Sequence, residues 1–279
     1  MFDDRTNPKS LQTGVERITQ QWFQHRGPWM GISEEKLSQT KLPDPLKWLY
    51  RFAGEWPSDN WWETVFAYQD MLLPFECLEV KEGKLVFVSE NQGVWHVGTL
   101  TEGEDPPVWV QENEPGAPWQ KLSDSLTEFL VTFCLHEIVF GAYHRAHIEG
   151  ILDQFAARGY HISPLWLDAP YVSLFDDHVS RPISFHLVDG RYLVMDKAWC
   201  GTWVDEPWTK FPDLFTPPDD SPRKIKGHEP LPEDMQIPDF VRKSHLQNLI
   251  RRHQHQAEYH QEMITKYEQV IDRMNGKDS

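Results

Sequence analysis

The sequence is poor in cysteine: its 279 residues include only Cys77, Cys134 and Cys200. Three widely spaced cysteines predict reduced thiols in a cytoplasmic compartment, because a disulfide framework needs a larger, even set. No apolar run approaches the roughly 20 residues of a membrane span. The first residues also lack the basic and apolar segments of a secretory signal. We therefore expect a soluble cytoplasmic protein with no membrane association.

Basic residues are scarce as well, since 27 Lys and Arg stand against 43 Asp and Glu, for a formal net charge of −16. Clustered basic side chains bind phosphate backbones, so this balance argues against direct nucleic-acid binding. The same acidity favours fast encounter with a basic partner, and it also serves simple solubility. The net charge therefore argues against some classes of binding partner, but it does not identify a particular one.

Known catalytic signatures are missing too. There is no Gly-x-Ser-x-Gly elbow, no Gly-rich phosphate loop and no cysteine with a local catalytic signature. The many carboxylates offer no pair that stands out as acid and base. The sequence therefore predicts a protein that is not an enzyme and has no catalytic residues and no cofactor.

A group of histidines supports one alternative. If the helix that contains His136 and Glu137 continues, then His136, His144 and His147 lie near one face and could hold zinc. The spacing departs from the His-Glu-x-x-His pattern, because position 140 is Phe. We expect surface histidines without metal here, and a metal-dependent enzyme remains an alternative.

Periodicity and turn residues predict helices over 11–24, 33–37 and 42–53, strands over 84–89, 93–99 and 108–111, and a β-rich stretch over 160–204. The turn Glu90-Asn91-Gln92 makes the first two strands a hairpin, and Asp189-Gly190 supplies the positive φ angles for another. Ser125 and Glu128 form a capping box. We expect the helix that it begins to run to about residue 150, with or without a break at Gly141.

The C-terminal part has a different character. Residues 211–239 are rich in Pro, Asp and Lys and predict a linker. Residues 240–276 predict one long helix with a weak heptad seam, in which His253, Ala257 and His260 replace larger apolar residues. The seam favours packing on the protein's own body, on a second copy as a homodimer, or on another chain.

Residues 42–130 contain an ordered set of short motifs. They are Leu42-Pro43 before Leu49-Tyr50 and Gly54, Leu85-Val86-Phe87 before Glu90-Asn91-Gln92-Gly93-Val94, Asp105-Pro106-Pro107-Val108 before Trp119, and Ser125-Leu126 before Phe129-Leu130. In this order, they resemble the SUKH superfamily. That family includes fungal cell-wall-synthesis regulators and bacterial immunity proteins of polymorphic toxin systems.

The resemblance implies an α+β fold whose mainly antiparallel sheet is flanked by helices, over residues 8–150. The rest of the sequence adds a β-rich extension over 151–210, the linker over 211–239 and the long helix over 240–276. The resemblance further implies a protein-binding module, foremost an immunity-type protein that neutralises a cationic toxin or nuclease. A regulatory scaffold that self-associates through its C-terminal helix is the alternative.

The partner-binding residues expected on this basis are Glu90, Asn91, Gln92, Trp95, Glu102 and Asp105. An acid and two amides in a tight turn offer acceptors and donors to a partner, and a tryptophan beside them could anchor an interface. Alternatively, Asn91 only stabilises the turn and Trp95 belongs to the core.

Overall fold

The computed structural model describes residues 7–22, 30–54, 66–142, 144–172, 180–204 and 206–215, together with positions 2 and 4. Its helices are α1 (Pro8–Trp22), α2 (Glu34–Leu37), α3 (Asp44–Ala53), α4 (Leu126–Gly141) and α5 (Ile151–Ala157), with 3-10 turns at Phe75–Cys77 and Pro207–Thr209. Its strands are β1 (Asp70–Leu72), β2 (Glu79–Lys81), β3 (Lys84–Glu90), β4 (Trp95–Thr99), β5 (Val108–Glu112), β6 (Gln120–Ser123), β7 (His144–His147), β8 (Ile162–Val172), β9 (Ser180–Val188), β10 (Tyr192–Met195) and β11 (Trp199–Thr202). The fold is α+β, as the sequence predicts.

The first sheet has the strand order β1-β3-β4-β5-β6, with β2 also paired to β3. Every pairing in it is antiparallel. The hairpin expected over 84–99 is confirmed as β3 and β4, which pair from Leu85↔Thr99 to Ser89↔His96. The short strands β1, β2 and β6 have no clear alternation of apolar and polar residues. Their positions are set by pairing with longer neighbouring strands.

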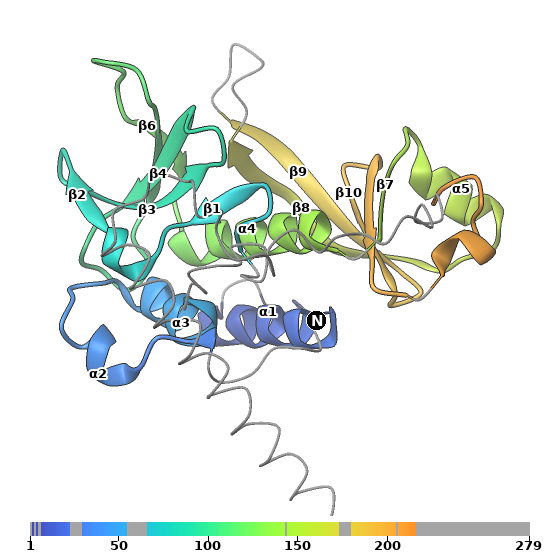
Figure 1. Ribbon diagram of the computed structural model, residues 1–279, viewed down its shortest axis with the longest axis horizontal. Helices are drawn as coiled ribbons and strands as arrows, with labels where there is room; N and C mark the ends of the chain where they lie inside the picture. Colours follow the sequence, from blue (N-terminus) through green and yellow to red (C-terminus); the bar gives the residue numbers. More distant parts are fainter. Residues whose placement is uncertain are drawn as a thin grey trace, which may run out of the picture.

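The second sheet has the order β7-β11-β10-β9-β8 and is also antiparallel. The hairpin expected at Asp189-Gly190 is confirmed between β9 and β10, with Tyr192 opposite Val188. Asp189 and Gly190 have φ angles of 47° and 69°, which are the positive values of a tight hairpin turn. The long β8–β9 ribbon arches past α4 toward α5 (Figure 1).

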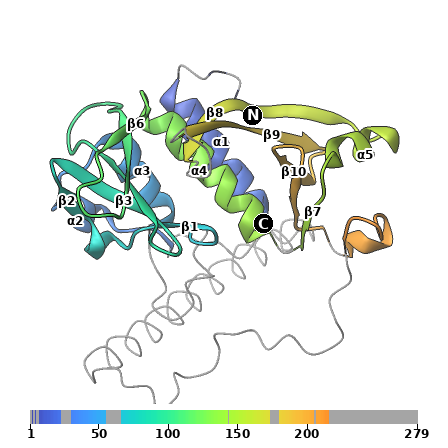
Figure 2. The ribbon, with the colours of Figure 1, turned by 90° about the horizontal axis from the view of Figure 1, so that it is seen from above.

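Helix α4 lies between the two sheets, with α1 beside it (Figures 1 and 2). In α4, only Glu128 and Phe140 are not buried. Phe129 contacts Phe87 of the first sheet, with ring centroids 5.9 Å apart. Toward the second sheet, the indole N–H of Trp166 in β8 donates a 2.9 Å hydrogen bond to Thr132 of α4. A helix that is apolar all round is suited to this central place.

The start of α4 is confirmed, and its predicted length is wrong. The Ser125 side chain accepts a hydrogen bond from the Glu128 N–H, as a capping residue does. The helix ends at Gly141, where a Cβ would lie 2.3 Å from the Tyr68 ring. Residues 144–147 form strand β7 against β11 instead of a further helical turn. Tertiary packing and strand pairing therefore override the local helical pattern.

Of the C-terminal part, the structure describes the beginning of the predicted linker. Phe211, Leu214 and Phe215 are buried in a second core cluster with Phe155 and Tyr192. The predicted helix over 240–276 and the rest of the linker lie outside the described residues. Among the described helices, none combines the length and apolar character needed to cross a membrane.

Candidate functional site

Two of the loops of the first sheet form one structural unit. Glu90 closes the β3–β4 turn, because its carboxylate accepts the N–H groups of Gln92 at 2.7 Å and Val94 at 3.2 Å. Asn113, in the loop after β5, donates its side-chain amide to the Gly93 carbonyl at 3.0 Å and its backbone N–H to the Val94 carbonyl at 2.8 Å. We call this unit, residues 90–94 and 112–117, the acidic tip.

The acidic tip contains three carboxylates, Glu90, Glu112 and Glu114, and no lysine or arginine. Val94, within the acidic tip, is 50% exposed. Few large apolar residues in the described part of the chain are as exposed as this. Asn91 is exposed beside it. An exposed apolar side chain and several carboxylates on the same bridged pair of loops offer a small surface that can receive both apolar and cationic groups.

The other predicted partner-binding residues do not join this surface. Trp95 is only 8% exposed and belongs to the main core. Glu102 and Asp105 follow the opposite end of β4, about 15 Å from the tip at the usual rise per strand residue. Glu102 forms an exposed ion pair with Lys41 at 2.9 Å. The structure thus groups Glu90, Asn91 and Gln92 with the loop after β5 and separates them from Glu102 and Asp105.

Asp105 has a local structural partner. One of its carboxylate oxygens accepts the Ser125 hydroxyl at 2.6 Å, and the other accepts the Thr127 N–H at 2.7 Å. A carboxylate at the start of a helix satisfies free N–H groups and complements the helix dipole. Asp105 therefore helps to begin α4.

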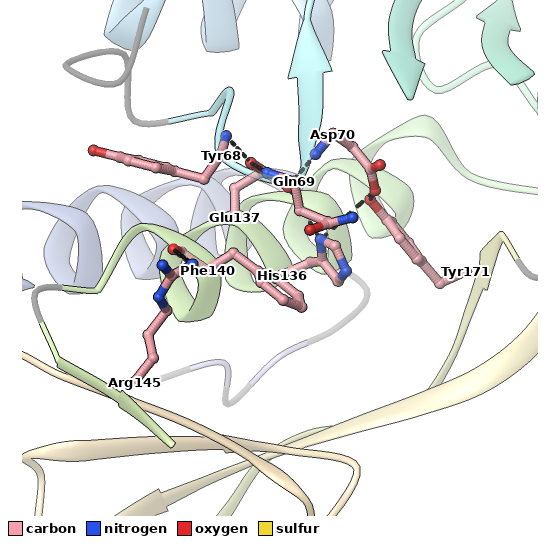
Figure 3. Close-up of polar contacts among 8 residues, drawn as sticks. All are labelled: Tyr68, Gln69, Asp70, His136, Glu137, Phe140, Arg145 and Tyr171. Carbon is pink, nitrogen blue, oxygen red and sulfur yellow. Dashed lines mark hydrogen bonds and ion pairs between the residues drawn. The ribbon is translucent and has the colours of Figure 1, made fainter. Parts of the chain in front are cut away.

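A second set of polar residues is buried where β1, α4 and β8 meet. Asp70, His136 and Glu137 place one ligand-capable atom each within 4.8 Å of the others. Figure 3 shows Glu137 reaching the backbone before β1, while Tyr171 of β8 lies against the Asp70 carboxylate. We call Asp70, His136, Glu137 and Tyr171 the buried acid cluster.

Glu137 is fully buried and its carboxylate is occupied. Oε2 accepts the N–H groups of Tyr68 at 2.6 Å and Gln69 at 3.0 Å, and Oε1 accepts the N–H of Asp70 at 2.9 Å. Nδ1 of His136 lies 3.1 Å from the same Oε1. Because a carboxylate only accepts, Nδ1 carries the proton in this contact. Four donors thus surround one carboxylate.

Asp70 is the group whose ionisation is most perturbed. The pKa of Asp70 is raised to about 6, chiefly by burial and also by the charge of Glu137, while His136 and the hydroxyl of Tyr171 act in the opposite direction. That hydroxyl donates to Oδ2 of Asp70 at 2.6 Å, and Nδ1 of His136 is 3.7 Å from the same oxygen. Burial also raises the pKa of Tyr171 well above its usual value. Tyr171 therefore stays a hydrogen-bond donor at neutral pH.

Two carboxylates and an imidazole are a ligand set that divalent metals can use. Here both oxygens of Glu137 already accept two donors each, and Nδ1 of His136 faces the carboxylates as a donor. A cation in the cluster would have to displace the three backbone N–H groups that donate to the Glu137 carboxylate. The geometry fits a hydrogen-bonded tie between α4 and the strands better than a metal centre.

The histidine arrangement considered as an alternative zinc site does not form. The helix ends before His144, so His144 and His147 lie on β7 while His136 lies on α4. His147 stacks on Trp199 with centroids 4.2 Å apart, and His144 meets the edge of another tryptophan. The expectation of surface histidines is also wrong for His136 and His144, which are 8% and 7% exposed.

Sequence reasoning noticed His136 and Glu137 but missed Asp70 and Tyr171. The useful signal was the run from Leu126 to Gly141, which is apolar on all sides and so predicts a buried helix. A pair of polar side chains inside such a helix requires buried hydrogen-bond partners. The sequence alone does not identify those partners, because Asp70 and Tyr171 are 101 residues apart.

Comparisons with known proteins identify no relative: no protein-family model, no curated protein and no solved structure matches the chain.

Proposed function

We propose that this chain is a protein-binding module whose acidic tip contacts a cationic protein partner. The observation that carries the proposal is the acidic tip itself, which combines a half-exposed Val94 with the carboxylates of Glu90, Glu112 and Glu114 on two loops that Asn113 joins. In its sharpest form, the proposal is an immunity-type protein of the SUKH class that blocks a toxin such as a basic nuclease. The resemblance over residues 42–130 and the antiparallel sheet flanked by helices support this form.

The chemistry of the tip suits such a partner. Interfaces gain much of their free energy from a few apolar anchors, and surrounding polar groups provide orientation. The three glutamates of the acidic tip favour lysine and arginine side chains, and the net charge of −16 would speed the encounter. Inhibition by such a contact needs only steric blockage of the partner.

The tip is also preorganised. Glu90 accepts two backbone N–H groups across the turn, and Asn113 makes two hydrogen bonds to it. The loop after β5 is fixed at its other end, where Gln111 donates its amide to the Ala117 carbonyl at 2.7 Å. Loops held in this way lose little conformational entropy when a partner binds. The free thiols of all three cysteines support the proposed cytoplasmic location.

The test compares two double charge reversals in the full chain. Glu112→Lys with Glu114→Lys alters the tip, and Glu102→Lys with Glu104→Lys applies the same change in net charge at the opposite end of β4. A partner recovered at low salt from the source cell is purified and titrated against each variant. At about 1 kcal/mol for each reversed contact, we expect the tip variant to bind about tenfold or more weakly and the control to stay within about threefold.

Two outcomes would contradict the proposal. Equal weakening by both variants would show a general charge effect without a defined surface. Recovery of no protein partner at low salt would argue against a binding module altogether. Val94→Asp provides an independent check, because it removes the apolar centre and should weaken binding even at high salt, where charge contributions are screened.

A further inference from the structure

A hollow of about 320 Å³ lies at the end of the second sheet, lined by Arg158, Gly159, Tyr160, Asp189, Arg191, Tyr192 and Lys210. Its size is at the lower end of the range for small-molecule sites. Three of its residues are cationic and one is anionic, in a chain with a net charge of −16. Figure 1 shows α5 and β10, which flank this hollow, at the end of the molecule opposite the first sheet.

The three cationic side chains of the hollow differ in the hydrogen bonds and ion pairs that they form. Arg158 caps the end of α5: it donates to the Gln154 carbonyl at 3.0 Å, and it forms an ion pair with Asp213. Arg158 therefore has structural partners. Arg191 and Lys210 are exposed, and neither has an ion-pair partner within the described part of the chain. Like charges that converge on one hollow repel each other, and a bound anion would remove that repulsion.

The backbone holds Arg191 and Lys210 in place while leaving their side chains free. The Arg191 N–H donates to the Val188 carbonyl at 2.9 Å, and its carbonyl accepts the Thr202 hydroxyl at 2.8 Å. The Lys210 N–H donates to the Pro207 carbonyl at 3.2 Å. The charged groups thus extend from fixed points on either side of the hollow, which lowers the entropy lost when they bind a ligand.

The remaining walls are aromatic and acidic, so the positive charge of the hollow comes from its arginine and lysine side chains. Tyr160 and Tyr192 belong to an aromatic cluster with Phe155 and Phe211. The ring of Phe155 contacts the other three rings, and Tyr160 also contacts Phe211, with ring centroids 5.1 to 5.8 Å apart. Asp189 is partly engaged, because it accepts the His161 N–H at 2.9 Å. Arginine and lysine together are a common set for phosphate recognition.

We propose that the hollow between α5, the β9–β10 turn and the 3-10 turn at Pro207–Thr209 binds a phosphate-bearing anion through Arg191 and Lys210. Arg158 completes the positive rim from its fixed position. This site is independent of the acidic tip, and either proposal can hold without the other. The chemistry selects a dianionic phosphate group and leaves the group attached to it open.

The test uses the full chain and inorganic phosphate as the probe, with potassium chloride at matched ionic strength as the reference. Isothermal titration and thermal unfolding are measured for the natural chain, for Arg191→Gln with Lys210→Gln, and for Lys41→Gln with Lys47→Gln. The last pair is a matched control: it removes the same charge from another hollow, where Lys41 pairs with Glu102 and Lys47 with Asp44.

We expect phosphate to bind the natural chain in the millimolar range or tighter and to raise its unfolding temperature. The Arg191 and Lys210 double variant should bind at least tenfold more weakly, and the control should stay within twofold. Circular dichroism checks that both variants are folded, which is expected because Arg191, Lys210 and Lys41 are exposed and Lys47 is half-buried. Equal affinity in all three proteins, or a response that potassium chloride reproduces, would overturn the proposal.

Discussion

Asp70→Asn is the substitution that most directly tests the electrostatics of the buried acid cluster. Asp70 is 3% exposed, and burial raises its pKa to about 6 in the folded protein. Asparagine has nearly the same shape as the protonated acid, and its oxygen can still accept the Tyr171 hydroxyl. The variant therefore mimics the uncharged form of Asp70 at every pH.

The expected effect follows from proton linkage. The folded protein holds the Asp70 proton more tightly than the unfolded chain, whose ordinary value is 3.8. Protonation thus stabilises the fold: the contribution is complete below pH 3.8 and is lost as pH rises through about 6. A pKa that is about two units higher corresponds to about 3 kcal/mol in total, of which about 1.4 kcal/mol is lost between pH 5.0 and 7.5.

Urea unfolding at pH 5.0 and pH 7.5 measures this directly. The free energy of unfolding of Asp70→Asn, relative to the natural chain, should increase by about 1.4 kcal/mol from the lower to the higher pH. Asp153→Asn, at an exposed position on α5, is the control and should show no such change. A difference for Asp70→Asn that stays constant between the two pH values would refute the reasoning. It would mean that the ionisation state of Asp70 in the folded protein does not change between these two pH values.

Three further substitutions test the structure around α4. Glu137→Gln removes a carboxylate that accepts three backbone N–H groups, so the free energy of unfolding at pH 7.5 should fall by about 3 kcal/mol or more. The control Glu128→Gln should lower it by less than about 0.5 kcal/mol. Gly201→Ala places a Cβ 2.7 Å from that of Ala142, and denaturant unfolding should show a loss of about 1–3 kcal/mol. Ser125→Ala removes the N-cap of α4 and should lower the melting temperature through a loss of about 1 kcal/mol, whereas Ser125→Gly should cost only a few tenths of a kcal/mol; equal losses in both would argue against the cap.

The sequence predicts well those parts of the fold in which the deciding interactions are local. Asp189-Gly190 needs only its own backbone preference to form a hairpin turn, and both flanking strands are found where they were expected. The same holds for Ser125, whose capping role depends on a residue three positions later. At both places, neighbours within a few residues carry the information.

The end of α4 depends on distant contacts, and there the prediction fails. Residues 142–147 contain no proline, so their pattern continues to favour a helix. Gly141 lies against Tyr68, and β7 pairs with β11, which is more than fifty residues later. A short strand of this kind forms because its partner offers free backbone groups, so its own residues carry little signal. The alternative of a zinc site at His136, His144 and His147 fails for the same reason, because it required the helix to continue past His144.

The buried acid cluster shows how tertiary structure gives a polar pair its role. His136 and Glu137 would be solvated on an exposed helix, and their sequence is compatible with that. Burial on all sides of α4 changes the chemistry, because each charge then needs a partner. The backbone before β1 supplies three N–H groups to Glu137 and positions Asp70 at the same time. The raised pKa of Asp70 is thus a consequence of how α4 is fixed between the sheets, and the pH dependence of stability reports on that packing.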